Sequence, residues 1–585
     1  MPLPIIDLAI LLANAGPIDC GKNERRIVAE TGRVEQEGPA MSMKPRAILE
    51  IPEETVRVAQ AAFPKGNIYM QMRDEWEGIY RDEQFADLYP PDGQPTIAPW
   101  RLALVTVMQF MENLSDRQAA EAVRDRIAWK YALGLELSDS GFDYSVLSEF
   151  RQRLIEHGAG QRLLDGLLSH LRTKGLLNGQ RQQRTDSTHI LAAVRELNRL
   201  ENVGETLRHA LNSLAGVAPD WLQEHLHPDW LDRYGKRFEN WRLPKSKAEQ
   251  QALAEQIGAD GYQLLAHLDE AATELWLRVL PAVEILRQVW QQQYSRVEGH
   301  VKQRLVKDMP PESTWIRSPY DSEARYCMKR NMGWLGYRTH LTETCEEGHP
   351  RLITQVKTTV ATEQDCEVTS SIQADLVAND LKPDSHLVDA GYVDAANLAH
   401  SQRDFSIDLL GPTRPDTSWQ AKDPDAFDIM QFSIDWDNKI VTCPAGQHSA
   451  VWAEGRSQED TSVIRVNFPM NACMACPLQS RCTRGVNRGL TLRPQAEHLA
   501  LQVARLRETT DAFWQQYRQR AGVEGTISQA VRGPGLRRSR YIGLAKTHLH
   551  AMSVAVALNV IRAINWLNEV PLAATRQPRF SPVAA

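Results

Sequence analysis

The stretch RTDSTHI, residues 184–190, is the first predicted strand of the α/β part of the chain, and it carries a candidate site residue. An Asn-Gly turn at 178–179 precedes it, and its Thr- and Ile-rich composition predicts a β-strand from Thr185 to Ile190. Asp186 lies inside this strand between two small hydroxyl residues. An aspartate followed by Ser-Thr is usually a turn or helix-cap residue. The position by itself therefore leaves open whether Asp186 is structural or one ligand of a metal site.

The chain before this strand has a helical pattern. Residues 98–135 predict two or three amphipathic helices with a break at NLSD, and residues 143–158 predict another helix. Ser115 and Gln118, three residues apart, predict a capping box just after the break. A helix-turn-helix fits residues 115–151 only loosely.

The chain after the strand changes from helices to a mixed α/β pattern. Residues 194–300 read as a helical block, and residues 315–345 are rich in Thr, Tyr and Trp with partial alternation, which predicts a meander of strands. Asp321 in this meander is expected to make a turn or an ion pair. Farther on, HLVDAGY (386–392) and SIDLLGPT (406–413) predict short strands separated by a helix. Strands that alternate with helices predict an α/β layer with a parallel part.

Two acids much later in the sequence lie in surroundings that suggest they share a site with Asp186. Asp389 ends the HLVDAGY strand, where open α/β sheets place their ligands, and Glu524 lies in a predicted helix (494–525) before a basic segment. Each also has a structural explanation, an Asx turn for Asp389 and a solvated helix position for Glu524. Three converging carboxylates could hold two divalent cations, and an oxygen-only donor set suits Mg²⁺ or Mn²⁺. The sequence therefore predicts that the three acids converge and act on a phosphodiester.

Four stretches of the chain carry a resemblance to a known family. They are RTDSTHI, SPYDSEARYCMKRNMGWLGYRTHLTET, VDAGY and QYRQRAGVEGTISQAVRGPGLRRSRYIGLAKTHLH. In this order they resemble the DDE insertion-sequence transposases with a ribonuclease-H-like core, of the IS-four/IS-five type and within it the IS-eleven-eighty-two group. The resemblance extends from about residue 60 to 565. It implies that Asp186, Asp389 and Glu524 are the catalytic triad and bind two Mg²⁺ or Mn²⁺ ions.

The region around Glu524 follows a pattern found in the related families, Tyr-x2-Arg-x3-Glu-x6-Lys. Tyr517, Arg520 and Glu524 fit it, and at spacings of i, i+3 and i+7 they would share one helix face. The resemblance implies that Tyr517 and Arg520 contact phosphates near the cleaved end, which suits the planar fork of an arginine. The lysine position holds a valine with Arg532 beside it. The last DNA contact is therefore expected from Arg532 or from a later lysine such as Lys546.

The segment after Glu524, RGPGLRRSRY (532–541), is strongly basic. Arginines interrupted by Gly-Pro-Gly suit a loop along a phosphate backbone, although a solvated surface loop has the same composition. The predicted DNA contacts in it are Arg532, Arg537, Arg538 and Arg540. By the resemblance, the partners are double-stranded DNA (terminal inverted repeats and target DNA) and a second copy of the protein in a synaptic complex.

Four of the eight cysteines fall within 40 residues: Cys443, Cys473, Cys476 and Cys482. A Cys-x2-Cys with two further cysteines predicts a zinc site, because two thiolates from one tight turn can grip a tetrahedral ion. Such a closed four-ligand site would be structural rather than catalytic. His448 is a spare ligand, and four unligated thiols are the alternative.

The composition is that of a soluble protein with several domains. The chain has 585 residues, 42% of them hydrophobic and 24% charged, and a formal net charge of −7. DNA binding would therefore need locally concentrated positive charge. The apolar stretch 551–567 contains Asn559, Arg562 and Asn565, which favours a buried helix over a membrane span. Because the N-terminus also lacks the pattern of a signal peptide, we expect a cytoplasmic protein.

These observations predict an α/β fold: a ribonuclease-H-like mixed sheet flanked by helices, with an N-terminal all-α domain, a helical insertion and a small zinc-binding insertion. The expected boundaries are a flexible lead-in (1–45), a helical DNA-binding domain (46–175), a catalytic domain (176–570) with its helical insertion (192–310) and Cys-rich zinc insertion (440–490), and a C-terminal tail (571–585). The expected function is transposition, with Mg-dependent cleavage at the terminal inverted repeats and transfer of the 3′-OH into target DNA. The alternatives are an inactive or domesticated zinc-stabilised DNA-binding protein and a metal-dependent nuclease with the same core.

Overall fold

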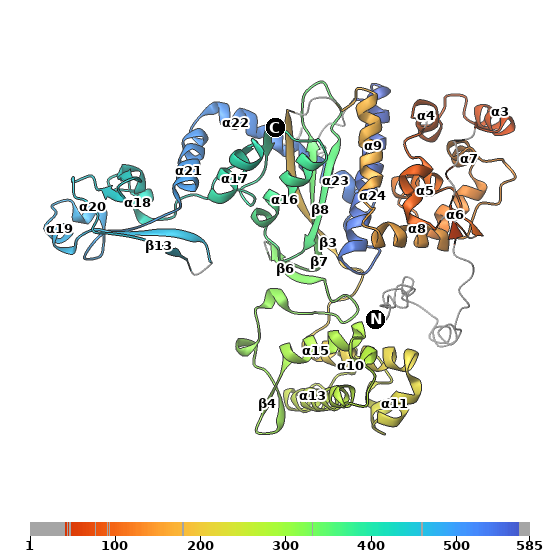
Figure 1. Ribbon diagram of the computed structural model, residues 1–585, viewed down its shortest axis with the longest axis horizontal. Coiled ribbons are helices and arrows are strands. Elements are labelled where there is room, and N and C mark those ends of the chain that lie inside the picture. The colour runs from red at the N-terminus through yellow and green to blue at the C-terminus, as the bar shows by residue number, and fades with distance from the viewer. Residues whose placement is uncertain are drawn as a thin grey trace, which may run out of the picture.

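The computed structural model describes residues 41–571, apart from residues 44, 46, 47, 49, 77, 91, 93, 178–180, 330, 458 and 459. The predicted lead-in (1–45) and tail (571–585) lie almost entirely outside the described residues. A mixed β-sheet stands at the centre with helices on both sides, and two units project away from it (Figure 1). One of these units is helical, and the other is built on a small antiparallel sheet.

The central sheet has six strands in the order β10-β9-β3-β7-β6, with β8 also paired to β7. β9 is parallel to β3 and β10, whereas β7 is antiparallel to β3, β6 and β8. The strand bounds are Gln182–Leu191 (β3), Arg325–Lys329 (β6), Met332–Thr344 (β7), Ile353–Val360 (β8), Ser385–Leu387 (β9) and Asp408–Leu410 (β10). The mixed sheet agrees with the predicted α/β class, and RTDSTHI lies in β3 at its middle.

Threonines satisfy the hydrogen-bonding needs of the buried strands. β7 is buried along most of its length on both faces. Thr185 Oγ1 lies 2.6 Å from Thr342 Oγ1, and Thr339 Oγ1 lies 3.0 Å from Thr358 Oγ1. Such cross-strand pairs stabilise a sheet and satisfy the hydroxyls that take part in them. The Thr-rich pattern therefore fits a sheet that is covered on both faces.

Four long helices belong to the layers next to the sheet. α16 and α17 connect the parallel strands, while α23 and α24 come from the C-terminal part of the chain. Their bounds are Asp365–Ala378 (α16), Ala395–Phe405 (α17), Gly522–Arg532 (α23) and Leu544–Leu567 (α24). In Figure 1, α24 lies between the sheet and the N-terminal helices.

Within the described part of the chain, α24 is the one helix long and apolar enough to cross a membrane, and most of its apolar stretch is buried inside the protein. It is apolar almost all round because it contacts β8 on one side and α5 and α9 on the other. Asn559 fixes it to the sheet: its Oδ1 accepts from the N–H of Ile353 and its Nδ2 donates to the carbonyl of Ile353, each at 2.7 Å. The helix predicted from 551–567 is thus a buried core element.

The N-terminal helices continue the core of the sheet. Their bounds are Glu53–Ala62 (α3), Ile68–Glu75 (α4), Asp82–Leu88 (η1), Pro99–Met111 (α5), Asp116–Asp125 (α6), Ile127–Leu133 (α7), Ser145–Glu156 (α8) and Arg162–Thr173 (α9), with the strand pair Met41–Ser42 (β1) and Gln94–Pro95 (β2). One hydrophobic cluster includes Trp129 and Leu167 of these helices, Tyr337 of β7 and Val556 of α24. The predicted boundary at residue 175 therefore does not divide two separate cores.

The capping box predicted before α6 is confirmed. Ser115 Oγ accepts from the N–H of Gln118 at 3.3 Å, and Gln118 Oε1 accepts from the N–H of Ser115 at 2.9 Å. These two bonds satisfy donors that the first helical turn leaves free. The break at NLSD therefore separates α5 from α6, as the sequence predicts.

The helical insertion between β3 and β6 has its own hydrophobic core, centred on Trp230, Trp290 and Tyr294. It begins with a capping box at Asn198 and Glu201. The bounds are Arg199–Val217 (α10), Pro219–His225 (α11), Trp230–Tyr234 (α12), Asn240–Arg242 (η2), Lys247–Asp269 (α13), Leu275–Arg278 (α14), Pro281–Gln293 (α15), Tyr294–Val297 (β4), His300–Gln303 (β5), Val306–Asp308 (η3) and Glu312–Thr314 (η4).

The Cys-rich unit projects from the other side of the sheet and has a small core of its own around Phe432, Val466 and Phe468 (Figure 1). Its bounds are Trp419–Lys422 (α18), Ile429–Gln431 (η5), Ser433–Asp435 (β11), Ile440–Thr442 (β12), Val451–Arg456 (β13), Ser462–Asn467 (β14), Met470–Met474 (α19), Gln479–Cys482 (α20) and Gly489–Leu492 (β15). Three further segments return the chain to the sheet: Gln495–Glu508 (α21), Asp511–Tyr517 (α22) and Arg518–Ala521 (η6).

Candidate active site

The three acids that the sequence singled out converge on the guanidinium of Arg520. Its Nη2 lies 2.6 Å from Asp186 Oδ2 and 3.8 Å from Asp389 Oδ2. Its Nη1 lies 3.2 Å from Glu524 Oε1. The structure thus places all three carboxylates next to one positive charge, although the Arg520–Glu524 contact joins residues only four apart in the chain. Among the described residues, the ligand oxygens of the three acids do not all lie within 4.8 Å of one another.

The strand register places Asp186 and Asp389 at corresponding positions along the parallel pair β3 and β9. β3 and β9 are parallel, with Arg184 opposite Leu387. Each acid follows its member of this pair by two residues, and side chains two residues apart along a strand point to the same face. Asp186 therefore approaches from the middle of β3, and Asp389 from the loop that follows β9.

Gly391 leaves room beside Asp389. Its N–H donates a hydrogen bond to Asp389 Oδ1 at 2.8 Å, which orients the carboxylate. A Cβ atom at position 391 would lie 2.9 Å from Asp389 Oδ1 and 3.0 Å from Asp365 Oδ2. A side chain there would push the Asp389 carboxylate aside, so glycine at this position preserves its orientation.

The carboxylate of Asp186 is largely shielded from solvent. Its side chain is 13% exposed, and this desolvation raises its pKa to about 6 even though Arg520 acts in the opposite direction. The N–H of Ser187 donates to Asp186 Oδ1 at 2.8 Å, and the exposed Lys329 on β6 also lowers the pKa. Asp389 raises it, because two nearby carboxylates repel each other. Positive charge between these acids is therefore favourable.

Glu524 lies in α23, the last of several helical segments where a single helix is predicted over 494–525: α21 ends at Glu508 and α22 begins at Asp511. α22 ends before a 3₁₀ turn (η6, Arg518–Ala521), and α23 begins after it. The break has a tertiary cause, since a guanidinium N–H of Arg184 donates to the carbonyl of Gln519 inside the turn. The dihedral angles stay right-handed throughout, so the chain direction continues across the turn.

Tyr517 ends α22 next to these acids. Its ring stacks on Phe513 with the centroids 5.8 Å apart, and it packs with Leu387 and Leu410 at the ends of the parallel strands. Burial raises the pKa of Tyr517, so its hydroxyl keeps its proton at neutral pH. A half-buried phenol beside a carboxylate cluster is a neutral hydrogen-bond donor.

The basic loop divides into two pairs of arginines. Arg537 Nη1 donates to the carbonyl of His189 at 2.6 Å, which ties the loop to β3. Arg540 donates to Leu114 and Asn113, so it ties the loop to the N-terminal helices. Arg532 and Arg538 are exposed instead. Of the four arginines of this loop that are predicted to contact DNA, two hold the protein together and two face solvent.

Lys546 and Asp321 are not part of the acid cluster. Lys546 is half-buried in the first turn of α24, and burial lowers its pKa, with Arg151 adding to the effect. Asp321 is buried; its Oδ1 accepts from the hydroxyl of Tyr337 at 2.6 Å and from the N–H of Ala324 at 3.2 Å. Asp321 therefore has the turn role that the sequence suggested.

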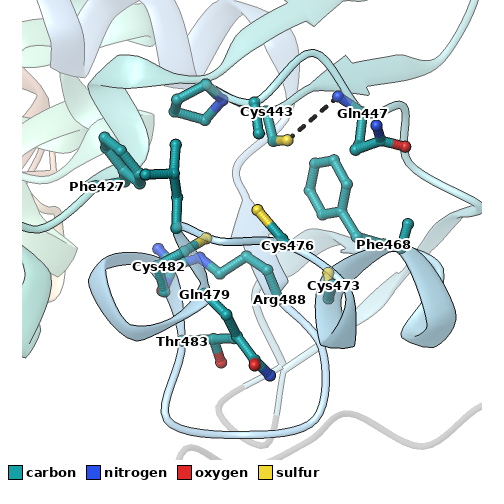
Figure 2. A pocket seen from close by; sticks show the side chains of 14 residues that line it. Phe427, Cys443, Gln447, Phe468, Cys473, Cys476, Gln479, Cys482, Thr483 and Arg488 are labelled. Atoms are coloured by element: carbon teal, nitrogen blue, oxygen red, sulfur yellow. Dashed lines mark hydrogen bonds between the residues drawn. The ribbon is translucent and has the colours of Figure 1, made fainter.

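Figure 2 shows the four clustered cysteines around one small cavity in the Cys-rich unit. The cavity has a volume of about 30 Å³ and is closed by two phenylalanines and an arginine. The N–H of Gln447 donates to Cys443 Sγ at 3.3 Å. Burial raises the pKa of Cys482, and the three other cysteines also raise it. The thiols are thus gathered in space, as the spacing predicts.

The four sulfur atoms do not form a closed ligand set. Among the residues that the structure describes, no three of these sulfurs lie within 4.8 Å of one another. Sulfur ligands of one tetrahedral zinc ion lie about 3.8 Å apart, because each Zn–S bond is about 2.3 Å long. The donor types therefore suit zinc, but the arrangement is wider than a bound ion requires.

One group of potential metal ligands was not found from the sequence. In the described ranges, His225, His267 and Glu270 have ligand atoms within 4.8 Å of one another. Local helix contacts account for them: His225 Nδ1 lies 2.7 Å from the carbonyl of Trp221, and His267 Nδ1 lies 2.9 Å from Glu270 Oε1. The group belongs to the helical insertion and adds no ligand to the acid cluster.

Two family models match the chain. Residues 57–153 match the model described as Transposase domain (DUF772), and residues 442–564 match the model described as Transposase DDE domain. The first covers the N-terminal helices from α3 to α8, and the second runs from the Cys-rich unit through Glu524 into α24. No curated protein and no solved structure matches the chain.

Both matches agree with the family expected from the sequence, the DDE insertion-sequence transposases. They support a transposase function, with DNA as the partner and a divalent metal as the cofactor. Neither match distinguishes one insertion-sequence group from another.

Proposed function

We propose that the protein is a DDE transposase that cleaves DNA at the terminal inverted repeats of its element and joins the freed 3′-OH to target DNA. The convergence of Asp186, Asp389 and Glu524 on Arg520 carries this proposal. The two transposase matches support it, since one of them includes Glu524 and the basic loop. The sheet would then be a ribonuclease-H-like core with its site at the middle of β3 and the end of β9.

The acid cluster fits divalent cations in its donor set. Asp186, Asp389 and Glu524 offer only carboxylate oxygens, which suit Mg²⁺ or Mn²⁺. The proximity of Arg520 to all three supports this, since the cluster already holds a cation. When bound, two such ions supply an activated attacking oxygen and stabilise the departing O3′.

The residues of the chain itself have separate roles in this proposal. Asp186 and Asp389 hold their carboxylates level on one side of the sheet, and Glu524 approaches from α23. Arg520 would exchange its carboxylate partners for a DNA phosphate, to which its planar fork is suited. Tyr517 would donate a hydrogen bond to a neighbouring phosphate.

The exposed arginines of the basic loop are the proposed backbone contacts. Arg532 and Arg538 are free to reach phosphates, whereas Arg537 and Arg540 would keep the loop in place for them. Lys546 is the weaker candidate because it is half-buried at the start of α24. The N-terminal helices would bind the terminal repeats, and two copies of the chain would synapse two element ends. Such a protein would act in the cytoplasm.

The cysteine cavity is proposed to hold a structural zinc ion. Four thiols line one cavity of about 30 Å³, and nothing else in its lining offers charge of the right sign. An ion there would stabilise the small core of this unit without taking part in DNA cleavage.

Cleavage of a labelled terminal-repeat DNA by the full-length protein tests the proposal. The variants Asp186→Asn, Asp389→Asn and Glu524→Gln keep the side-chain shape but remove the charge, so each should abolish cleavage and strand transfer while repeat binding persists. Asp511→Asn, an exposed acid in α22, is the matched control and should cleave normally. Strand transfer by the triple variant would overturn the proposal.

Product analysis separates the proposal from its alternatives. A transposase yields joined products with target DNA, whereas a metal-dependent nuclease with the same core yields only cleaved ends. A domesticated or inactive DNA-binding protein binds the repeats and yields neither.

A further inference from the structure

A buried carboxylate lies under the candidate active site without belonging to it. Glu343 in β7 has a side chain with 0% exposure and stands directly opposite Arg184 in β3. Arg184 Nε donates to Glu343 Oε1 at 2.8 Å, and Arg184 Nη2 lies 2.6 Å from the same oxygen. Burying such a pair is costly, and removal of either partner leaves an uncompensated charge in the interior.

The second oxygen of Glu343 binds the two C-terminal helices. Thr526 in α23 donates its hydroxyl to Glu343 Oε2 at 2.5 Å, and Arg562 in α24 donates from Nη1 to the same oxygen at 2.8 Å. Arg562 Nη2 also donates to Thr526 Oγ1 at 2.7 Å. One carboxylate therefore joins β3, β7, α23 and α24.

Arg184 extends the same network to the turn before α23. One of its guanidinium N–H groups donates to the carbonyl of Gln519, next to Arg520. Gly522 packs directly over the guanidinium, where a Cβ would lie 2.3 Å from Arg184 Nη1. The turn and the start of α23 therefore pack directly against the Arg184 side chain. The close packing of position 522 on the guanidinium needs a glycine.

We propose that Glu343, Arg184, Thr526 and Arg562 (the Glu343 network) position the acids of the active site relative to one another. The inference rests on the proposed function. Its members are the near neighbours of the site: Arg184 precedes Asp186 by two residues, and Thr526 follows Glu524 by two. The network thereby ties the helix that carries Glu524 to the strand that carries Asp186.

The directionality of hydrogen bonds explains why buried charged residues, rather than apolar ones, connect α23 to the sheet. An apolar cluster could stabilise the same helix–sheet contact, often at lower cost. It would not fix the rotation of α23 about its axis or its shift along the sheet, because apolar contacts are not directional. The carboxylates must be held within about 0.5 Å of their working geometry, and hydrogen bonds from supporting residues supply that precision.

Thr526→Val tests the network, because it keeps the side-chain shape and removes only the hydroxyl. Cleavage of terminal-repeat DNA by the full-length variant is measured against MnCl₂ concentration, with repeat binding in EDTA and thermal unfolding alongside. We expect a cleavage rate about 10- to 100-fold lower, with a higher half-saturating Mn²⁺ concentration. Thr526→Ser keeps the hydroxyl and should restore both to near the parent values.

Thr206→Val in α10 is the matched control. Thr206 is also fully buried in a helix, and its hydroxyl donates to the carbonyl of Asn202 at 2.6 Å. A purely structural effect of losing a buried hydroxyl should appear in thermal unfolding of both variants, whereas the Mn²⁺ requirement should change only in Thr526→Val. If Thr526→Val does not fold, Arg562→Gln, which changes the more exposed end of the network, replaces it with the same expectation.

An unchanged Mn²⁺ requirement and rate in the folded variant would overturn the inference. That outcome is distinct from failure of the proposed function, in which the parent protein itself would not cleave terminal-repeat DNA with Mg²⁺ or Mn²⁺. An equal change in Thr206→Val would also count against the network, because it would assign the effect to general destabilisation.

Discussion

Arg520 and Asp186 form the shortest ion pair of the acid cluster, with 2.6 Å between Nη2 and Oδ2. Both side chains are 13% exposed, so solvent screens this pair less than it would screen a pair at the surface. The same Nη2 faces Asp389. A divalent ion that enters between these acids must therefore compete with the guanidinium.

Replacing Arg520 should separate metal binding from catalysis. Without the guanidinium, Arg520→Gln should bind Mn²⁺ more tightly, by about tenfold, which corresponds to about 1.4 kcal/mol. It should cleave DNA more slowly, because the phosphate contact is lost. Calorimetric titration with MnCl₂ and a cleavage assay measure the two effects. Arg518→Gln, an exposed arginine of the same turn, is the control, and weaker Mn²⁺ binding by Arg520→Gln would contradict the competition.

The two kinds of arginine in the basic loop should respond differently to truncation. Arg538→Ala should weaken binding to the terminal repeat and lower the slope of log affinity against log salt by about one, with thermal stability unchanged. Arg540→Ala should destabilise the fold by about 1–3 kcal/mol, since it removes the hydrogen bonds of its guanidinium to the carbonyl of Leu114 and to the side-chain oxygen of Asn113. Binding titrations at several salt concentrations and chemical denaturation check the pair. The reverse pattern would show that the loop takes another arrangement on DNA.

The cysteine cavity should contain metal in the purified protein. We expect about one zinc ion per chain by elemental analysis, lost in Cys476→Ser, and rapid proteolysis within the Cys-rich unit once the ion is gone. Cys366→Ser, a free cysteine of α16, is the control and should retain the ion. Equal protease resistance with and without chelator would contradict a structural ion.

Buried histidines should make the fold sensitive to acid. Burial in the contact between α5 and α24 lowers the pKa of His550 to about 3, and the charges of Arg540 and Arg151 act in the same direction. The unfolded histidine titrates near 6.5, so below that pH the unfolded chain takes up a proton that the folded chain does not. Stability from this group is therefore complete above pH 6.5 and falls by about 1.4 kcal/mol per pH unit as the pH drops toward 3.

His550→Asn keeps an acceptor for the N–H of Arg540 and removes the titrating ring. The slope of unfolding free energy against pH between 6.5 and 4 should become shallower in this variant, as followed by denaturant titration at several pH values. The exposed His300→Asn should leave the slope unchanged. An unaltered slope in His550→Asn would mean that other groups control the acid sensitivity.

The sequence by itself determined the local elements and the identity of the candidate residues. A Thr- and Ile-rich run predicted β3, and the capping box at Ser115 predicted the start of α6. Polar residues within 551–567 predicted a buried helix, because all these signals depend on neighbours a few residues away. The resemblance in RTDSTHI and VDAGY singled out the acids. The family matches agree with that reading at the level of a DDE transposase.

Only the tertiary structure decided how those residues act on one another. The sequence could not predict that a guanidinium from β3 would break the helix before Glu524, because Arg184 and Gln519 are distant in the chain. It also could not separate Arg540, which binds inside the protein, from Arg538, which faces solvent: in a run of arginines the composition is the same. Glu343 gave no signal, since the role of a buried acid depends on the partners that folding brings to it.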